Sequence, residues 1–453
     1  MILKTRLFGR TYEFKDVKDV LAKANEEKSG DTLAGIGAMS TEQRVAAKVV
    51  LAEMTLGDLR NNPVVPYEED EVTRVIQDAV DENLYRQIKG LTVGEFREFL
   101  LSAESDEIKR ISAGLTAEMV AAVTKLMGNM DLIYAAGKLR VTAHCNTTIG
   151  EKGILASRVQ PNHPTDDIPG ITASLKEGIS YGSGDAVVGL NPVFDTVENL
   201  SRTFNAFDEF VTKWRIPTQI CVLGHITTQM ETLKAGVPMD LMFQSLAGSQ
   251  KSNLSFGIDV AMLDEGYAMM KQLGKAKGPN VMYFETGQGS ELSSEGHNGA
   301  DQLTMEARCY GLAKRYSPFL VNTVVGFIGP EYLYDAKQVT RAGLEDHFMG
   351  KLSGLPMGVD ACYTNHMKAD QNDIENLMVL LANAGCNFFM GIPTADDVML
   401  MNQTTSYHDV AAVREITNTR PIKEFENRLA ELGILDENGR LTDRAGDPSI
   451  FAD

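Results

Sequence analysis

The stretch AVVGLNPVFDTVENLSRTFNAFDEFVTKWRIPTQICVLGH, residues 186–225, contains the pattern that decides the fold. An apolar run of strand length, AVVGLNPV (186–193), comes first. It is followed by TVENLSRTFNAFDEFVTKW (196–214), whose apolar residues recur at helical spacing, and then by a second apolar run, TQICVLGH (218–225). Strand, helix and strand in this order are typical of a parallel sheet whose strands are joined by crossover helices.

The same unit recurs along the rest of the chain, where eight apolar runs alternate with amphipathic segments. They are GILASRVQ (153–160), AVVGLNPV (186–193), TQICVLGH (218–225), LMFQSLAG (241–248), VMYFETG (281–287), FLVNTVVG (319–326), LPMGVDACY (355–363) and NFFMGIP (387–393). Eight such units predict a closed (β/α)8 barrel of the TIM type, an α/β fold. A doubly wound open sheet is the alternative, but no GxGxxG sequence follows the first strand.

The residues before the barrel have a helical pattern. STEQRVAAKVVLAEM begins with a capping box made by Ser40 and Gln43, and LTVGEFREFLL begins with one made by Thr92 and Glu95. We therefore expect three regions: a mainly helical N-terminal extension (1–140) that covers the barrel or makes oligomer contacts, the catalytic barrel (141–405), and a C-terminal helical extension (406–453).

Composition narrows the class of protein. With 43% apolar and 23% charged residues, the 453-residue chain has the composition of an ordinary globular protein. Its net charge of −19 argues against nucleic-acid binding, because a phosphate backbone requires a clustered basic surface. No stretch approaches 18 uncharged apolar residues, so no membrane span is expected. The five cysteines form no CxxC pair and the first residues hold no signal-peptide core, so we expect a cytoplasmic protein.

Polar residues stand where the predicted strands end, and in such barrels the active site lies at the carboxyl ends of the strands. These residues are Arg158, Gln160, Asn191, His225, Ser245, Glu285, Asn322 and Asp360, and the last strand ends with Met390. Two acids, an arginine and several amides at one mouth are too polar for a packing layer. Singly they have simpler explanations: Arg158 and Glu285 form a structural ion pair, or Asn191 before Pro192 shapes a turn.

Several long motifs resemble the large, catalytic subunit of ethanolamine ammonia-lyase over essentially the whole chain. They are SRVQPN, GLNP, FETGQGSELSSEGHNGADQ, GFIGPEYL, MGVDACYTNHM and GIPTADDVMLMNQTTSYHD. The resemblance implies a carbon–nitrogen lyase of ethanolamine degradation that uses adenosylcobalamin to convert ethanolamine to acetaldehyde and ammonia by a radical route. It also implies a separate small subunit that closes over the cobalamin, a homo-oligomer of large subunits, and residence in a bacterial microcompartment.

The resemblance also implies roles for individual residues. The substrate contacts would be Arg158, Gln160, Asn191, Glu285 and Asp360, and the catalytic residues among them Glu285, Asp360 and Arg158. Carboxylate and amide oxygens suit an ammonium, and Arg158 with Asn191 can donate to a hydroxyl oxygen. We further expect Arg158 to help keep the nearby carboxylates ionised at neutral pH, by opposite-charge stabilisation. The cofactor contacts would be Ser245, Val324, Phe327 and Met390.

A metal held by the protein itself is not expected. EDHFMG (345–350) resembles the Asp-x-His-x-x-Gly signature of histidine ligation to cobalt, but its acid is Glu345 and the segment has a helical pattern. His347 is therefore expected at the surface. Two other functions remain open: a metal-dependent aldolase or hydrolase barrel with Glu285 and Asp360 as ligands, and a non-catalytic barrel that serves as a scaffold.

Overall fold

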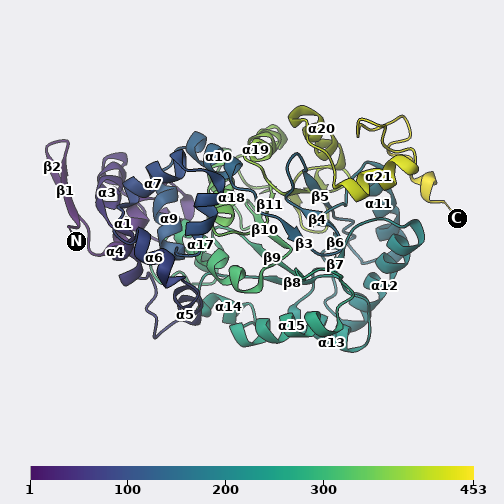
Figure 1. The fold of residues 1–453 in the computed structure, drawn as a ribbon, viewed down its shortest axis with the longest axis horizontal. Coiled ribbons are helices and arrows are strands. Elements are labelled where there is room, and N and C mark those ends of the chain that lie inside the picture. Colours follow the sequence, from purple (N-terminus) through teal and green to yellow (C-terminus); the bar gives the residue numbers. More distant parts are fainter. Residues whose placement is uncertain (1, 453) are drawn as a thin grey trace.

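The computed structural model describes residues 2–452, and a parallel eight-stranded sheet forms its centre (Figure 1). Each apolar run predicted from the sequence contains one strand of this sheet. The strands are β5 (Ala156–Val159), β6 (Val187–Leu190), β7 (Ile220–Val222), β8 (Met242–Ser245), β9 (Met282–Thr286), β10 (Leu320–Val324), β11 (Met357–Asp360) and β13 (Phe388–Gly391). The predicted α/β barrel is confirmed.

The strands follow chain order around the ring, and their register pairs are all parallel. The remaining gap lies between β7 and β8. There the backbone N–H of Leu241 donates to the carbonyl of Ile220 at 3.3 Å, and the N–H of Ile220 donates to Asp240 Oδ2 at 3.0 Å. These two hydrogen bonds complete the barrel without a regular ladder.

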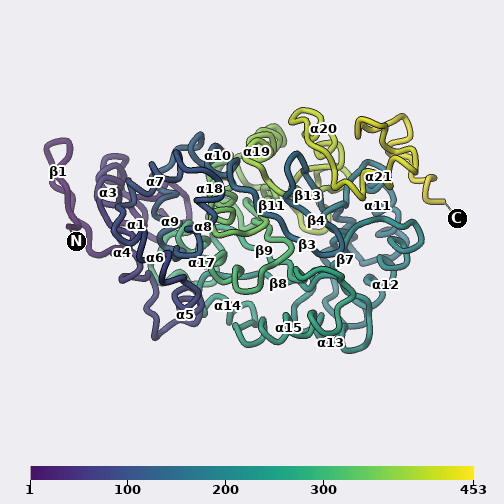
Figure 2. Tube along the Cα trace, viewed as in Figure 1, coloured from purple at the N-terminus to yellow at the C-terminus, as the bar shows by residue number. Residues whose placement is uncertain are grey.

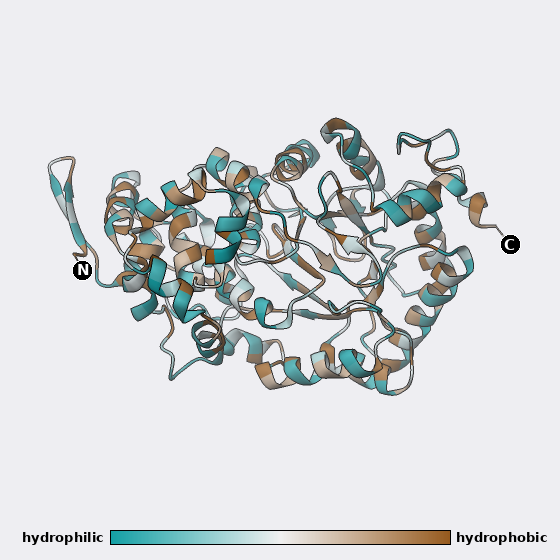
Figure 3. Cartoon of the chain, viewed as in Figure 1, coloured by the Kyte–Doolittle hydropathy of each residue, from teal (hydrophilic) through white to brown (hydrophobic). Residues whose placement is uncertain are grey.

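Helices surround the strands and bury their apolar faces against them (Figure 3). They are α11 (Ile168–Ser180), α12 (Val197–Trp214), α13 (Ile226–Lys234), α14 (Gln250–Ser255), α15 (Val260–Leu273), α16 (Ser290–Ser293), α17 (Gln302–Ala313), α18 (Ala336–Leu352), α19 (Gln371–Asn383) and α20 (Tyr407–Thr417). In α12, Thr196 caps the first turn by accepting from the N–H of Asn199, and the helix ends at Arg215 in the left-handed conformation. Its buried Leu200, Phe204 and Phe207 recur at helical spacing, as the sequence pattern predicts.

The N-terminal region consists of a hairpin and ten short helices at one end of the barrel (Figures 1 and 2). The hairpin strands are β1 (Lys4–Leu7) and β2 (Arg10–Glu13). The helices are α1 (Val17–Ala24), α2 (Ser29–Leu33), α3 (Thr41–Glu53), α4 (Leu56–Asn61), α5 (Glu71–Asp78), α6 (Glu82–Ile88), α7 (Val93–Ser102), α8 (Ser105–Ser112), α9 (Ala117–Lys125) and α10 (Asn129–Lys138). The predicted helical character is confirmed, and the boundaries of the three regions stay a prediction.

Of the two capping boxes, that of Thr92 and Glu95 is complete. Ser40 accepts from the N–H of Gln43 as predicted, but the Gln43 side chain accepts from the N–H of Met39, one residue before the cap.

Buried ion pairs join the N-terminal helices to the barrel helices. Arg308 of α17 donates to Asp70 and Glu118, both at 2.8 Å, and Lys28 donates to Glu345 of α18 at 2.8 Å. All five side chains are almost completely buried. Charges removed from water are tolerated only when paired, so these contacts specify how the two regions pack.

One sequence expectation is wrong here. EDHFMG is helical, within α18, but His347 is fully buried instead of exposed. The reason is that α18 packs between the strands β10 and β11 on one side and the helices α9 and α10 on the other. Burial holds the pKa of His347 well below its usual range.

The remaining elements are short. Near the barrel lie β3 (Ala143–His144), β4 (Thr148–Ile149), η1 (Lys314–Tyr316), β12 (Tyr363–Thr364), β14 (Asp396–Asp397) and β15 (Asn402–Gln403). The chain then passes through α21 (Lys423–Glu431) and η2 (Pro448–Phe451), at the opposite end of the molecule from the hairpin (Figure 2). Within residues 2–452, no helix combines the length and the apolar character needed to cross a membrane.

Candidate active site

Arg158 is the centre of a hydrogen-bonded cluster inside the carboxyl end of the barrel. Its side chain is 1% exposed. One Nη donates to Glu285 Oε1 at 2.9 Å and to the hydroxyl of Tyr283 at 2.8 Å, and the other donates to Asn191 Oδ1 at 2.6 Å. Burial disfavours the charge, but Tyr283 and Glu285 outweigh it and raise the pKa of Arg158, so the guanidinium stays a cation. The cluster links β5, β6 and β9.

A glycine on the neighbouring strand makes room for this guanidinium. The carbonyl of Gly189 accepts a hydrogen bond from Arg158 Nε at 3.3 Å. A Cβ atom at residue 189 would lie 2.8 Å from that same Nε, which is closer than real Cβ contacts allow. The glycine in VVGL therefore has a packing reason within the site.

Glu285 has one anchored oxygen and one available oxygen. Its Oε1 accepts from Arg158, from the Tyr283 hydroxyl at 2.8 Å and from Asn322 Nδ2 at 3.3 Å. Across the described chain, no donor reaches Oε2, and Glu285 lines a cavity. Asn322 in turn keeps a buried Oδ1 without a donor from the protein. The strand end thus presents one carboxylate oxygen to whatever occupies the mouth.

Sequence reasoning missed Tyr283 as a site residue. It precedes Glu285 by two positions on β9, so the alternation of a strand places both side chains on the same face. Counting back two residues from each polar strand end would have identified it. Asn322 was noted at its strand end, but no role was assigned to it.

Asp360 lies at the end of β11 and is 4% exposed. Its Oδ1 accepts from the hydroxyl of Thr404. Burial raises the pKa of Asp360 to about 7, even though the Thr404 hydrogen bond and the charge of Arg158 act in the opposite direction. Arg158 therefore acts on Asp360 in the expected direction, toward the ionised form, but desolvation has the larger effect on the pKa of this carboxyl group.

Gln160 and Asn191 each keep one polar group available. Gln160 Nε2 donates to Asp397 Oδ2 at 2.7 Å, which leaves the Gln160 carbonyl oxygen without a donor from residues 2–452. Asn191 uses its Oδ1 for Arg158, and its Nδ2 meets no acceptor in that same range. Gln160 directly follows β5 and Asn191 directly follows β6, while Arg158, Glu285 and Asp360 lie in the last two positions of their strands. The five predicted substrate residues therefore all stand at the same end of the barrel.

A cavity of about 390 Å³ opens beside Glu285. Three of the four residues predicted to contact a cofactor line it, namely Ser245, Val324 and Phe327. Apart from Gln244, the rest of its wall is apolar or hydroxyl-bearing, with contributions from Leu246, Phe256, Ile328, Ser290 and Ser293. Met390 is different: it is fully buried on β13, in register with Arg158, and is not among the lining residues.

Large apolar side chains are exposed on the loops around this mouth. Phe194 follows β6, Phe327 follows β10, and Val398 and Met401 follow β13, with exposures between 42% and 67%. Exposed apolar side chains gathered at one rim are typical of a surface that another molecule covers. The mouth is therefore suited to a large apolar ligand or a second polypeptide.

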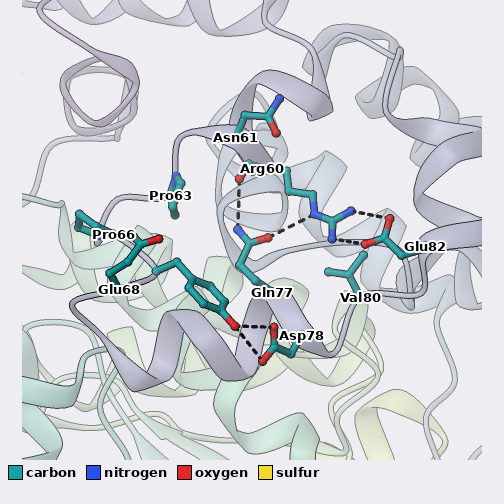
Figure 4. Close-up of a pocket in the computed structure, with 10 residues that line it drawn as sticks. Arg60, Asn61, Pro63, Pro66, Glu68, Gln77, Asp78, Val80 and Glu82 are labelled. Carbon is teal, nitrogen blue, oxygen red and sulfur yellow. Dashed lines mark hydrogen bonds and ion pairs between the residues drawn. The ribbon is translucent and has the colours of Figure 1, made fainter.

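A larger cavity, of about 750 Å³, lies among the N-terminal helices (Figure 4). Several of its polar groups are already paired with one another. Arg60 is bonded to Glu82 and to Gln77, and the hydroxyl of Tyr67 donates to Asp78 at 3.0 Å. This cavity is the larger of the two. The barrel mouth is nevertheless the better candidate for a binding site, because it has polar groups without a partner among the described residues and such groups give a site its specificity.

The protein offers few groups arranged for a metal ion. Within the described part of the chain, no three His, Cys, Asp or Glu side chains cluster in a way that could hold one. One carboxylate oxygen of Glu285 and one of Asp360 accept hydrogen bonds from neighbouring side chains.

The chain resembles known proteins over its full length. A sequence model described as "Ethanolamine ammonia lyase large subunit (EutB)" matches residues 12–444. Proteins named "Ethanolamine ammonia-lyase large subunit" from Escherichia coli (strain K12) and from Salmonella typhimurium (strain LT2) are each 58% identical over 453 residues, which is 100% of this chain and of each relative.

Among solved structures, a mandelate racemase/muconate lactonizing protein from Herpetosiphon aurantiacus aligns with 74% of this chain and 79% of its own. Its sequence identity is 12% and its TM-score 0.32, a superposition too loose to support any argument about function.

Proposed function

Because the chain belongs to the ethanolamine ammonia-lyase large-subunit family, we propose that it converts ethanolamine to acetaldehyde and ammonia with adenosylcobalamin bound at the barrel mouth. The observation that carries the proposal is a set of acceptors, without donors from residues 2–452, at the carboxyl end of the barrel, among which Glu285 lines the cavity. Glu285 and Asp360 each have one oxygen held by a neighbour and one without a donor from the described chain, and the Gln160 carbonyl oxygen has no donor there either. An ammonium group has three donors and no acceptor, so it is complementary to these acceptor oxygens.

The other end of the substrate is served by donors. Asn191 keeps its Nδ2 available, and the buried Arg158 lies beside it. An amide and a guanidinium can both donate to a hydroxyl oxygen, so the site distinguishes the two ends of a small amino alcohol by hydrogen-bond polarity. Charge-assisted hydrogen bonds from buried groups hold such a molecule in one orientation.

Asp360 is suited to a proton-holding role. With a pKa of about 7, it passes between its charged and neutral forms near neutral pH. A carboxyl group tuned in this way can take a proton from the substrate's ammonium as the amino group departs and return it later. Glu285 lies beside it and provides the second acceptor for the same group.

Bound adenosylcobalamin would supply the radical chemistry of the reaction. We assign its contacts to Ser245, Val324 and Phe327, which line the cavity beside Glu285, with Met390 in the barrel wall behind. Apolar walls keep water and reactive side chains away from such chemistry. The exposed apolar rim supports the further proposal that a small subunit completes the site.

Family membership alone is the basis for two more proposals: that large subunits associate with one another, and that the enzyme resides in a bacterial microcompartment.

The test is an assay of the chain together with its small subunit, adenosylcobalamin and ethanolamine. We expect acetaldehyde and ammonia in equal amounts and an electron paramagnetic resonance signal during turnover, both lost when the cofactor or the small subunit is omitted. Absence of acetaldehyde from the folded, complete mixture would refute the proposal. Activity that needs a divalent metal instead of cobalamin would favour the metal-dependent barrel.

A further inference from the structure

The loop after the last barrel strand, residues 392–406, folds back over the mouth. Its two ends are tied together by the N–H of Ile392, which donates to the carbonyl of Thr405 at 3.2 Å. Between them, β14 and β15 pair antiparallel, and β15 pairs with β12 from the loop after β11. We call residues 392–406 the return loop. It brings two buried side chains, Asp397 and Thr404, to residues of the proposed substrate site.

Thr404 acts on Asp360. Its backbone is held by an N–H to carbonyl hydrogen bond with Ala395 at 2.9 Å, and its hydroxyl donates to Asp360 Oδ1. A donor on one oxygen stabilises the ionised carboxyl group and fixes its rotation, so that Oδ2 is the oxygen left for a ligand. The charged or titratable groups that also face Asp360 are Glu285 from β9, Arg158 from β5, Asp397 from the return loop and Cys362 after β11.

Asp397 acts on Gln160. Its Oδ1 accepts from the backbone N–H groups of Met399 and Leu400, at 3.0 and 2.8 Å. Its Oδ2 accepts from Gln160 Nε2 at 2.7 Å and from Asn162 Nδ2 at 2.9 Å. Since a carboxylate offers only acceptors, Gln160 must turn its nitrogen toward Asp397 and its carbonyl oxygen away.

We propose that the return loop orients the substrate site, with Thr404 and Asp397 as positioning residues that present one oxygen each of Asp360 and Gln160 to the substrate ammonium. The inference rests on the proposed function and adds to it two residues that do not touch the substrate. Both act through hydrogen bonds within the protein. Their loop follows β13 in the chain, whereas Gln160 follows β5 and Asp360 ends β11.

The proposed role of Thr404 is tested by the pH profile of kcat/KM in the complete enzyme. Thr404→Val keeps the shape of the side chain and removes the donor to Asp360. A hydrogen bond to a charged group is worth about one pKa unit or slightly more, so the acid limb should move about one pH unit upward. Activity should then fall about fivefold at pH 7 and recover largely by pH 9. Thr404→Ser, which keeps the hydroxyl, should leave the limb in place.

Thr405→Val is the matched control. Thr405 is adjacent and equally buried, but its hydroxyl donates to the carbonyl of Met390 instead of to an acid. Its variant should lose stability without moving the acid limb. If the acid limb lies at the same pH in the parent, in Thr404→Val and in Thr405→Val, the proposed role of Thr404 is wrong. If Thr404→Val is insoluble, Thr404→Ala removes the same hydroxyl and is judged by the same criterion.

The proposed role of Asp397 is tested by ethanolamine binding. In Asp397→Asn, an amide cannot accept from both pairs of donors, so Gln160 rotates and its nitrogen faces the substrate ammonium. We expect KM and the calorimetric Kd for ethanolamine to rise by about tenfold or more, more than kcat falls. Asp396→Asn is the control, since the exposed Asp396 accepts only from Gln403 at 2.9 Å within residues 2–452.

If Asp397→Asn and Asp396→Asn bind ethanolamine with equal affinity, the proposed role of Asp397 is wrong. A parent enzyme without any ethanolamine conversion would instead refute the proposed function, so the two failures are distinguishable.

Discussion

Glu285 owes its position to three donors that meet the same carboxylate oxygen. Arg158, Tyr283 and Asn322 all donate to Oε1, while Arg158 uses its other Nη for Asn191. A purely structural Arg–Glu pair would commonly engage both carboxylate oxygens in a two-pronged contact. Here the ion pair exists, as the simpler explanation of these residues supposes, but it leaves Oε2 toward the cavity and so serves binding as well as stability.

This asymmetry predicts the result of Glu285→Gln. The three donors will hold the amide oxygen, so the amide nitrogen must point into the cavity at the substrate ammonium. Losing a charge-assisted hydrogen bond costs about 1.5–3 kcal/mol, so kcat/KM should fall by at least about ten- to a hundredfold, and the facing donors should add to that loss. The measurement is steady-state acetaldehyde formation by the complete enzyme.

Glu295→Gln is the control for that variant, because it removes one acid from the exposed part of the loop that follows the same strand. It should leave kcat/KM unchanged. If Glu285→Gln stays within about threefold of the parent, Glu285 has only a structural role.

Helices α17 and α18 join the two parts of the molecule. They face the barrel strands on one side and the N-terminal helices on the other, and they carry Arg308 and Glu345 into the interface. Buried charges in such places contribute little net stability over an apolar pair, but they penalise every packing that leaves one of them unpaired. They thereby select one docking of the N-terminal helices.

Arg308→Met tests this interface. Removing the guanidinium leaves the carboxylates of Asp70 and Glu118 buried without their cation, which should destabilise the fold by about 3–5 kcal/mol. Arg315→Met breaks an ion pair with Asp264 whose side chains are 45% and 41% exposed, and it should cost less than about 1 kcal/mol. Denaturant unfolding of both variants, followed by circular dichroism, measures the difference. Equal midpoints would show that the buried pairs do not hold the N-terminal helices.

The protein as a whole contains several acids that burial holds toward their neutral form. The pKa of Asp31 and that of Asp346 are each raised to about 7, by burial in both cases, with the charge of Asp301 acting further on Asp31. The pKa of Glu345 instead falls to about 2, because Lys28 and Arg341 together outweigh its burial. The interior therefore loses stability both as pH rises toward 7 and as pH falls toward 2.

Thermal stability should accordingly decrease between pH 5 and pH 7 and level off above that. A raised folded-state pKa means that the native protein binds protons more tightly than the unfolded chain, so stability present at acid pH is lost as pH rises through about 7. Glu345 acts in the opposite direction, and its contribution is lost only as pH falls toward 2. Melting temperatures across this range provide the measurement. Asp31→Asn should flatten the decrease, and an unchanged slope would show that Asp31 titrates normally.

Cofactor affinity should depend on the assembled complex. The barrel mouth is open and bordered by exposed apolar side chains, so this chain alone covers only part of a large ligand. We expect the isolated chain to bind adenosylcobalamin weakly. Addition of the small subunit should lower Kd by at least about tenfold, which needs only about 1.4 kcal/mol of added contact. Equal Kd values with and without the small subunit would contradict a shared binding site.

The amino-acid sequence by itself determined the strands, the helix starts at Ser40 and Thr92, and the polar strand ends. These features depend on periodicity and on neighbours within a few positions, which a strand such as MYFET and a cap such as Thr92 carry in themselves. Parallel strands bring their carboxyl ends together, so Arg158 and Glu285 could be assigned to one mouth before any coordinates existed.

Only the tertiary structure decided what surrounds those residues. Thr404 reaches Asp360 across 44 positions, and Asp397 reaches Gln160 across 237, with no periodic signal at either end. The burial of His347 and the raised pKa of Asp360 likewise depend on elements packed from elsewhere in the chain. Local patterns specify which face of an element is apolar, but the free energy of a charge or a hydrogen bond depends on every group that surrounds it after folding.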